Sequence, residues 1–224
     1  AYSMFANCAS LKSLNLSGWD IPSCASVDHM FSNCQSLASL DLSGWRIADD
    51  ASSTPGASSK STMFNECTAL SELKLADSDI YTVSSILGVL DPETREGLKT
   101  LDISNADLSS GTSLRGLFGQ MKSLASLDLS GWDPSSVTDF SQMFQGCSSL
   151  ATIDLSGWDT SNATSLCKMF EGCSSLTSLD LSGCDVSPSA DLSDMFEGCT
   201  SLASLNLSGC TAQTARLLLQ ALST

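Results

Sequence analysis

The chain has 224 residues, and its 25 acidic against 10 basic residues give a net charge of −15. This balance disfavours nucleic acid and anionic membrane surfaces as partners, because both attract Lys and Arg. No apolar run approaches the roughly 20 residues that a transmembrane helix needs, so membrane insertion is not expected. Only 6% of the residues are aromatic, which is low for a conventional globular core.

The sequence repeats itself with a period of 26 residues. The same step separates phenylalanines of one motif: Phe5 and Phe31, then Phe118, Phe144, Phe170 and Phe196. A fixed period of this size indicates a solenoid, in which each unit contacts mainly its neighbours. Because the chain already matches the motif at Met4, we interpret it as a mature or trimmed segment of a longer protein.

Each unit carries a Leu-x-x-Leu-x-Leu motif. The eight copies begin at Leu11, Leu37, Leu70, Leu98, Leu124, Leu150, Leu176 and Leu202. Alternation over so few residues predicts a short strand with one buried face. We therefore expect an α/β repeat fold, a leucine-rich-repeat solenoid with a curved parallel sheet on its concave side and short helices on its convex side.

The return segment of each regular unit is predicted to be helical. Leu166, Met169, Phe170 and Cys173 stand at positions i, i+3, i+4 and i+7, which places them on one helix face. Gly172 is expected to end that helix. Such helices of two to three turns would be stable only when packed on the strands.

Two stretches interrupt an otherwise regular array. We assign residues 1–210 to a solenoid of eight units, with irregular insertions at 46–62 and 76–100. The first insertion is rich in Ser, Ala, Pro and Gly and indicates an exposed loop, and the second indicates a longer helix. Residues 211–224 form either a helical cap or the start of a further repeat.

A Ser-Gly pair and then Trp or Cys follow the strand in six units. These residues are Trp19, Trp45, Trp132, Trp158, Cys184 and Cys210, and their strict periodicity predicts that they point into the core. An acidic column follows this position, and its members are expected to cap the next turn or helix. They are Asp20, Asp79, Asp107, Asp133, Asp159 and Asp185.

The consensus MFxGCSSLxSLDLSGWDxSxxT resembles the BspA-like bacterial surface family of leucine-rich repeats. The resemblance is strongest at residues 4–45 and 120–210 and weak at 46–116. It implies a secreted or surface-anchored bacterial protein that acts in adhesion and protein binding. The family offers no catalytic residues to carry over.

Six of the ten cysteines share one repeat position and are predicted to be small buried hydrophobes. They are Cys8, Cys34, Cys67, Cys147, Cys173 and Cys199. Cys24 and Cys167 do not follow the repeat, and either could be free or bridged. With His29 as the single histidine and no paired C-x-x-C motif, neither a zinc site nor an enzyme activity is expected, and no cofactor is predicted.

The candidate site is the exposed face of the sheet. Its residues are Asp41, Asp102, Asp128, Asp154 and Asp180, with Ser126, Thr152 and Ser178 beside them. One hypothesis is that this acidic row binds a protein, either a basic one or a host surface protein. A weaker alternative places Ca²⁺ at Asp128, Asp154 and Asp180. The plain explanation is solvation plus hydrogen bonds from the neighbouring Ser and Thr hydroxyls. The competing function is a structural spacer of a larger surface protein. The oligomeric state is left open.

Overall fold

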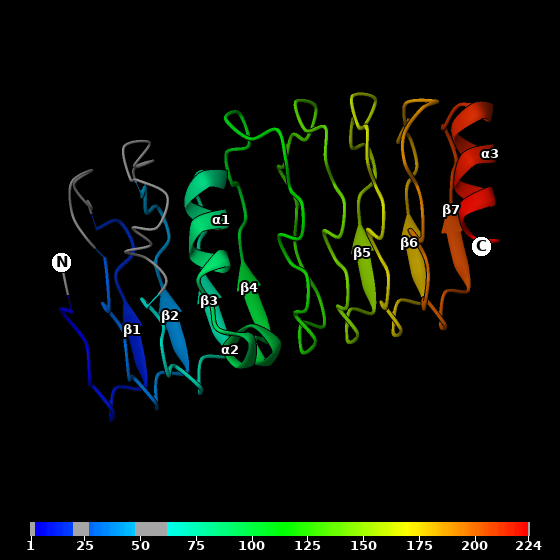
Figure 1. The fold of residues 1–224 in the computed structure, drawn as a ribbon. Helices are drawn as coiled ribbons and strands as arrows, with labels where there is room; N and C mark the ends of the chain where they lie inside the picture. The colour runs from blue at the N-terminus through cyan, green and yellow to red at the C-terminus, as the bar shows by residue number, and fades with distance from the viewer. Residues whose placement is uncertain (1–2, 20–26, 48–61, 224) are drawn as a thin grey trace. The chain divides into compact units, whose positions relative to one another are not determined.

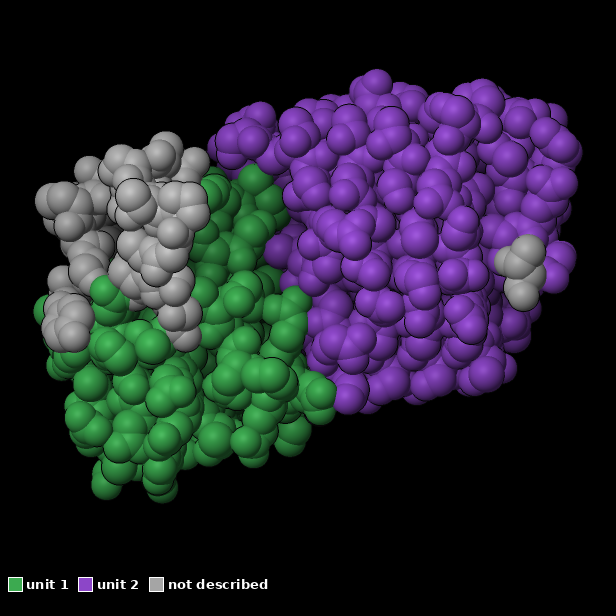
Figure 2. All heavy atoms as spheres, viewed as in Figure 1, with its two compact units in different colours: residues 1–106 green, residues 107–224 purple. Residues whose placement is uncertain are grey.

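The structure is a computed structural model that describes residues 3–19, 27–47 and 62–223. The chain divides into two compact units, residues 1–106 and 107–224, which Figure 2 shows in green and purple. Each unit is described below by itself.

The first unit is built on a four-stranded parallel sheet in the order β1-β2-β3-β4 (Figure 1). The strands are β1 (Ser13–Asn15), β2 (Ser39–Asp41), β3 (Glu72–Lys74) and β4 (Thr100–Asp102). Their central leucines are in register, so that Leu40 lies between Leu14 and Leu73. Leu40 and Leu73 are fully buried.

The second unit repeats this arrangement with three parallel strands. They are β5 (Thr152–Asp154), β6 (Ser178–Asp180) and β7 (Ser204–Asn206), in that order. Isolated parallel bridges also join Ser113 to Asp139, Asp139 to Ser165 and Ser165 to Asp191, and together they form a second ladder. Each unit is therefore a leucine-rich-repeat solenoid, which confirms the expected parallel stacking. The copy at residues 126–128 is the exception among the described units, because it forms no regular strand, although Leu127 and Leu129 are buried.

The prediction of helices in the regular return segments is wrong. Residues 166–173 form two consecutive turns instead, closed by hydrogen bonds from Met169 N–H to Leu166 O and from Cys173 N–H to Phe170 O. The third residue of each turn has a positive φ, 58° at Lys168 and 75° at Gly172, which interrupts an α-helix. The backbone N–H groups that would bond within a helix donate instead to backbone carbonyl oxygens of the next repeat.

Helices do form where the sequence leaves the repeat. The connection from β3 to β4 contains α1 (Ile80–Gly88) and α2 (Pro92–Gly97), so the helix expected in 76–100 is present as two. The tail forms α3 (Ala212–Ala221). Of the insertion at 46–62, residues 48–61 lie outside the described part of the chain. No helix in the described ranges combines the length and apolarity that crossing a bilayer requires.

Helices α1 and α3 are joined to the preceding repeat in the same way. The third residue of each helix is a buried threonine, Thr82 in α1 and Thr214 in α3. Thr82 Oγ1 accepts a hydrogen bond from Ile47 N–H at 2.8 Å, and Thr214 Oγ1 accepts one from Val186 N–H at 3.3 Å. A helix can thus replace a turn segment without losing the link to its neighbour.

Aromatic columns fill the core of each unit. In the first unit the rings of Phe5, Phe31 and Phe64 stack at centroid distances of 5.8 and 5.6 Å. In the second unit the rings of Trp132 and Trp158 stack at 6.4 Å. Three of the four tryptophans, Trp45, Trp132 and Trp158, are buried, as expected. For Trp19 the expectation is wrong, because 44% of its surface is exposed in a first repeat that has no neighbour on one side.

Candidate interaction face

In the first unit the strand aspartates do not lie next to each other. Asp41 on β2 and Asp102 on β4 are both in register with Lys74 on β3, which lies between them. Lys74 Nζ is also 3.5 Å from a carboxylate oxygen of Glu72 on the same strand. Opposite charges therefore alternate in this sheet.

The second unit does hold neighbouring carboxylates. Asp154 on β5 is in register with Asp180 on β6, and Thr152 is in register with Ser178. Thr152, Asp154 and Ser178 are exposed, and Asp180 is half-buried. Asp128 and its neighbour Ser126, which belong to no regular strand, are exposed as well.

Every one of the predicted site aspartates is fixed by a turn at the end of its strand. Its Oδ1 accepts a hydrogen bond from the backbone N–H of the serine two residues later. The distances are 2.9 Å from Ser130 to Asp128, 2.9 Å from Ser156 to Asp154 and 2.8 Å from Ser182 to Asp180. Asp41 and Asp102 make the same bond at 3.0 and 3.1 Å. Hydrogen bonds therefore stabilise the carboxylates, but the donor that all five share is a serine backbone N–H group and not the hydroxyl of the plain explanation, although Ser104 Oγ also donates to Asp102 at 2.8 Å.

At Asp128 and Asp180 the hydrogen bonds favour the ionised carboxylate. The N–H and hydroxyl of Ser130 lower the pKa of Asp128 below its ordinary value. The pKa of Asp180 is lowered by the hydroxyl of Ser182, then by the N–H of Ser182 and by Asn206. Asn206 Nδ2 donates to Asp180 Oδ2 at 3.0 Å. The sequence analysis missed this contact, and the change from Asp to Asn at one repeat position is the signal that could have shown it.

Nothing in the arrangement favours a metal ion. Within the ranges that the structure describes, no group of three or more His, Cys, Asp or Glu side chains is placed to hold one. The row of Asp128, Asp154 and Asp180 is thus a series of separate carboxylates, each held by its own turn.

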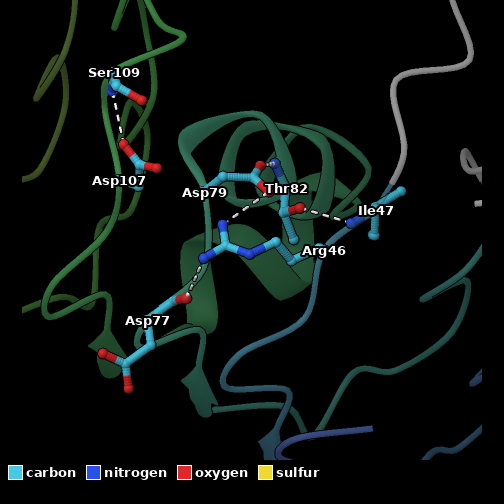
Figure 3. A network of polar contacts seen from close by, with 7 residues as sticks. All are labelled: Arg46, Ile47, Asp77, Asp79, Thr82, Asp107 and Ser109. Carbon is cyan, nitrogen blue, oxygen red and sulfur yellow. Dashed lines mark hydrogen bonds and ion pairs between the residues drawn. The ribbon is translucent and has the colours of Figure 1, made fainter. Parts of the chain in front are cut away.

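Four described members of the second acidic column cap the following turn or helix, as predicted: Asp79, Asp107, Asp133 and Asp159. Asp185 instead accepts from Thr211 N–H at 2.9 Å, 26 residues further on. Asp79 is the N-cap of α1 and accepts from Thr82 N–H at 2.7 Å. Arg46 reaches the other oxygen of Asp79 at 3.2 Å and the carbonyl oxygen of Asp77 at 3.4 Å (Figure 3). In the second unit, Asp107 Oδ1 accepts from Ser109 N–H at 2.9 Å. Asp20 lies outside the described residues.

Five of the six periodic cysteines donate a hydrogen bond from Sγ–H to a backbone carbonyl oxygen. Nine cysteines lie in the described ranges and none of them forms a disulfide, Cys167 included, whereas Cys24 lies outside those ranges. Cys173 Sγ donates to Phe144 O at 3.2 Å, and four other members of the column make the equivalent bond. The expected burial as small hydrophobes is confirmed for most of them, and Cys8 and Cys199 are half-buried. The hydrogen bond was not foreseen.

Residues 1–73 and 92–210 match the family described as "Mycoplasma protein of unknown function, DUF285". The chain belongs to this family. The match omits residues 74–91, which include α1, where the turn segment is replaced by a helix. No curated protein matches the sequence.

Several solved structures of leucine-rich-repeat proteins are similar to this chain. A leucine-rich-repeat protein of Treponema pallidum is 16% identical with a TM-score of 0.36, and the match covers 94% of this chain and 83% of that one. A leucine-rich-repeat protein of Leptospira interrogans is 16% identical with a TM-score of 0.41, and the match covers 91% of this chain and 56% of that one. An internalin of Listeria monocytogenes is 16% identical with a TM-score of 0.35, and the match covers 91% of this chain and 62% of that one. The chain thus spans less than two thirds of the length of the last two proteins.

Proposed function

We propose that the protein is a non-enzymatic recognition module that binds another protein through the second unit's polar sheet face. This recognition face consists of Ser126 and Asp128, Thr152 and Asp154, and Ser178 and Asp180. The observation that carries the proposal is the fixed orientation of its carboxylates, each held by a backbone N–H within 2.9 Å. An acceptor that is already oriented loses little conformational freedom when a partner binds.

The chemistry of the face suits a cationic partner. The turn uses Oδ1 of Asp154, and no contact of its Oδ2 is found within the described ranges. Lys and Arg form their strongest hydrogen bonds with such ionised oxygens. Neighbouring strands of a parallel sheet lie about 4.8 Å apart, so Asp154 and Asp180 present two carboxylates at a spacing that one Arg or two Lys side chains can meet. The net charge of −15 would steer a basic partner toward the protein.

The resemblance to BspA-like repeats supports an adhesive role at a bacterial surface. Under this proposal the partner is a basic protein or a host surface protein, and the chain is displayed outside the cell. The competing function is a spacer that holds other domains of a surface protein and has no ligand.

A charge reversal on the recognition face tests the proposal. Asp154→Arg is compared with Asp159→Arg, a matched control in the second acidic column that is also exposed and also bonds a serine N–H, that of Ser161 at 3.1 Å. Binding is measured by surface plasmon resonance against a panel of purified matrix and cell-surface proteins. We expect Asp154→Arg to weaken binding by about tenfold or more, or about 1.4 kcal/mol, with Asp159→Arg close to wild type.

The other outcomes are equally informative. Equal losses in both variants would show a general charge effect and contradict a specific face. A panel in which no protein binds the wild type would favour the spacer.

A further inference from the structure

A small cavity lies inside the second unit, between the repeat that contains β5 and the repeat that contains β6. Its volume is about 20 Å³. Trp158, Met169, Cys184 and Met195 are among the residues that line it, together with Leu218 of α3. Every lining residue is buried, with at most 7% of its surface exposed. The cavity is therefore part of the core and not of the outer surface.

The cavity marks the point at which one column of the core changes from Trp to Cys. Trp132 and Trp158 are consecutive members of this column, and their rings are parallel to within 2° at a centroid distance of 6.4 Å. The next member is Cys184, whose Sγ–H still donates to Leu155 O at 3.2 Å. Its side chain is much smaller than an indole, so it leaves space next to the Trp158 ring.

The wall of the cavity excludes several kinds of guest. No nitrogen or oxygen atom is exposed on it, because the one polar lining residue, Thr160, donates its hydroxyl to Asp185 O at 2.6 Å. A buried water needs two to four polar partners, and Ca²⁺ or Mg²⁺ needs oxygen ligands. Pockets for organic ligands measure about 300–1,000 Å³. The space therefore suits neither water, a hard cation nor an organic molecule, but it can hold a single ion.

Three of the lining residues carry sulfur. Met169 and Met195 occupy the same position in consecutive repeats, so stacking of the repeats brings both thioethers to one cavity. Cys184 adds a thiol from the column of Trp and Cys residues. Thiolate and thioether groups are the ligands that soft ions such as Cu(I) prefer. The ring of Trp158 adds an aromatic face, which attracts a cation.

We propose that this cavity is a binding site for one soft univalent metal ion, Cu(I) or its analogue Ag(I), with Cys184, Met169 and Met195 as ligands. Binding breaks the S–H bond of Cys184 and forms a sulfur–metal bond, and the proton is released to solvent. The metal keeps its oxidation state, so the step needs no oxidant or reductant. The carbonyl oxygen of Leu155 loses the thiol donor but keeps the N–H of Trp158 at 3.2 Å.

The charge of the ion decides which metals fit. One thiolate neutralises one univalent ion, so no net charge is buried among apolar side chains. A divalent ion such as Zn²⁺ would leave a net positive charge there, and it takes four ligands in structural sites. The site also differs from clusters of His, Cys, Asp and Glu, of which the described ranges hold no group of three that could bind a metal. No residue of the recognition face lines the cavity, so the proposal is independent of the proposed function.

Methionine methyl NMR of the 224-residue chain tests the site directly. The chain has seven methionines, and each gives one methyl resonance. Silver nitrate in chloride-free buffer is the probe, because Ag(I) is stable in air and diamagnetic. The ion must enter a buried cavity through local opening, so each titration point is read at equilibrium.

The variants separate this site from the other thiols, which all of them except Cys184→Ala retain. Met169→Leu and Met195→Leu each remove one thioether at nearly equal volume and assign the two resonances. Met143→Leu is the matched control, because Met143 has the same repeat position and is fully buried but does not line the cavity. Circular dichroism confirms that each variant is folded.

We expect the first equivalent of Ag(I) to shift the resonances of Met169 and Met195 and to leave the other five unchanged. Competition with a chelator of known affinity should show that the double variant Met169→Leu/Met195→Leu binds this equivalent about tenfold or more weakly, with Met143→Leu equal to the wild type. Cu(I) supplied without oxygen should give the same pattern, and Zn²⁺ should not. In Cys184→Ala both shifts should disappear.

Three results would overturn the proposal. Ag(I) that leaves the resonances of Met169 and Met195 in place while it is taken up would bind at other cysteines instead. Equal affinity of the double variant and the wild type would show that the thioethers are not ligands. Shifts that persist in Cys184→Ala would show the same for the thiol.

Discussion

The indole N–H of Trp45 donates a hydrogen bond of 2.9 Å to the carbonyl oxygen of Leu16, in the preceding repeat. In the second unit, Cys184 Sγ makes the equivalent bond to Leu155 O at 3.2 Å. Both pairs are separated by 29 residues. Trp and Cys differ greatly in size, but both are apolar side chains with a donor that reaches the end of the neighbouring strand. This shared ability explains why both occur at one repeat position.

Trp45→Phe should destabilise the protein. The Phe ring fills most of the space of the indole but removes one of the two donors to the carbonyl oxygen of Leu16, which keeps the hydrogen bond from Trp19 N–H at 3.2 Å. The expected loss is about 0.5–1.5 kcal/mol in the free energy of unfolding, measured by urea denaturation. Trp19→Phe, at the exposed counterpart, should change it by less than about 0.5 kcal/mol. Equal stability of the wild type and Trp45→Phe would show that the bond contributes nothing.

Stability should fall at alkaline pH. Burial raises the pKa of the Cys67 and Cys184 thiols from 9.0 to about 12 and that of Cys199 to about 11. In the unfolded chain these thiols ionise near 9, so the unfolded state binds fewer protons than the folded state above that pH. Their contribution is complete below pH 9 and is lost as pH rises toward the folded values, by at most about 1.4 kcal/mol per pH unit for each thiol.

Urea denaturation between neutral pH and pH 11 measures this loss. Cys67→Ala should be less stable at neutral pH, but its stability should decline less steeply above pH 9. A stability curve that stays flat through the alkaline range would contradict the burial of neutral thiols.

Asn206→Ala should raise the pKa of Asp180. In the folded protein that pKa is lowered mainly by Ser182 and also by Asn206, whose amide donates to Asp180 Oδ2. Removing the amide takes away one hydrogen bond to the ionised form and leaves the turn intact. Carboxyl NMR during an acid titration follows the change. Asp128, which is held by Ser130, is the internal control and should titrate as in the wild type. An unchanged Asp180 would show that the amide contact is not formed in solution.

Gly198→Ala and Gly88→Ala should have opposite effects. Gly198 has a φ of +74°, and an added Cβ would lie 3.3 Å from the backbone of Gly172 in the preceding repeat. The left-handed backbone alone costs an alanine about 1–2 kcal/mol. At Gly88, the last residue of α1, no atom lies within 4 Å of the added Cβ, and the expected gain is about 0.4–1 kcal/mol. Thermal unfolding compares the two, and a stable Gly198→Ala would contradict the tight stacking at this column.

The strands could be predicted because their pattern is local and unambiguous. Two leucines separated by one polar residue place one face inward, and equal connections leave parallel stacking as the consistent arrangement. The return segments could not be predicted in the same way. Spacings of three and four residues, as between Leu166, Met169 and Phe170, fit two successive turns as well as a helix. The deciding feature is the positive φ at Lys168 and Gly172, and Lys168 carries no sequence signal for it.

The residue types of the candidate site and their order along the sheet follow from aligning the repeats. Lys74 occupies the repeat position of Asp41 and Asp102, and the register of the strands places it between them. Strand alternation likewise places Asp154 and Asp180 on the outer face of the sheet. The hydrogen bonds from serine N–H groups depend on the turn geometry after each strand, which strand alternation does not specify.

The buried hydroxyls of Thr82 and Thr214 give this architecture room for evolutionary change. Each accepts a backbone N–H of the adjacent repeat, as the sideways bonds do elsewhere, so a helix and a double turn are interchangeable parts joined to a constant strand. Whole repeats of either type could be gained, lost or exchanged by recombination without redesigning their neighbours. The length of the array and the shape of its flank can therefore diverge among relatives while the stacked leucines stay the same.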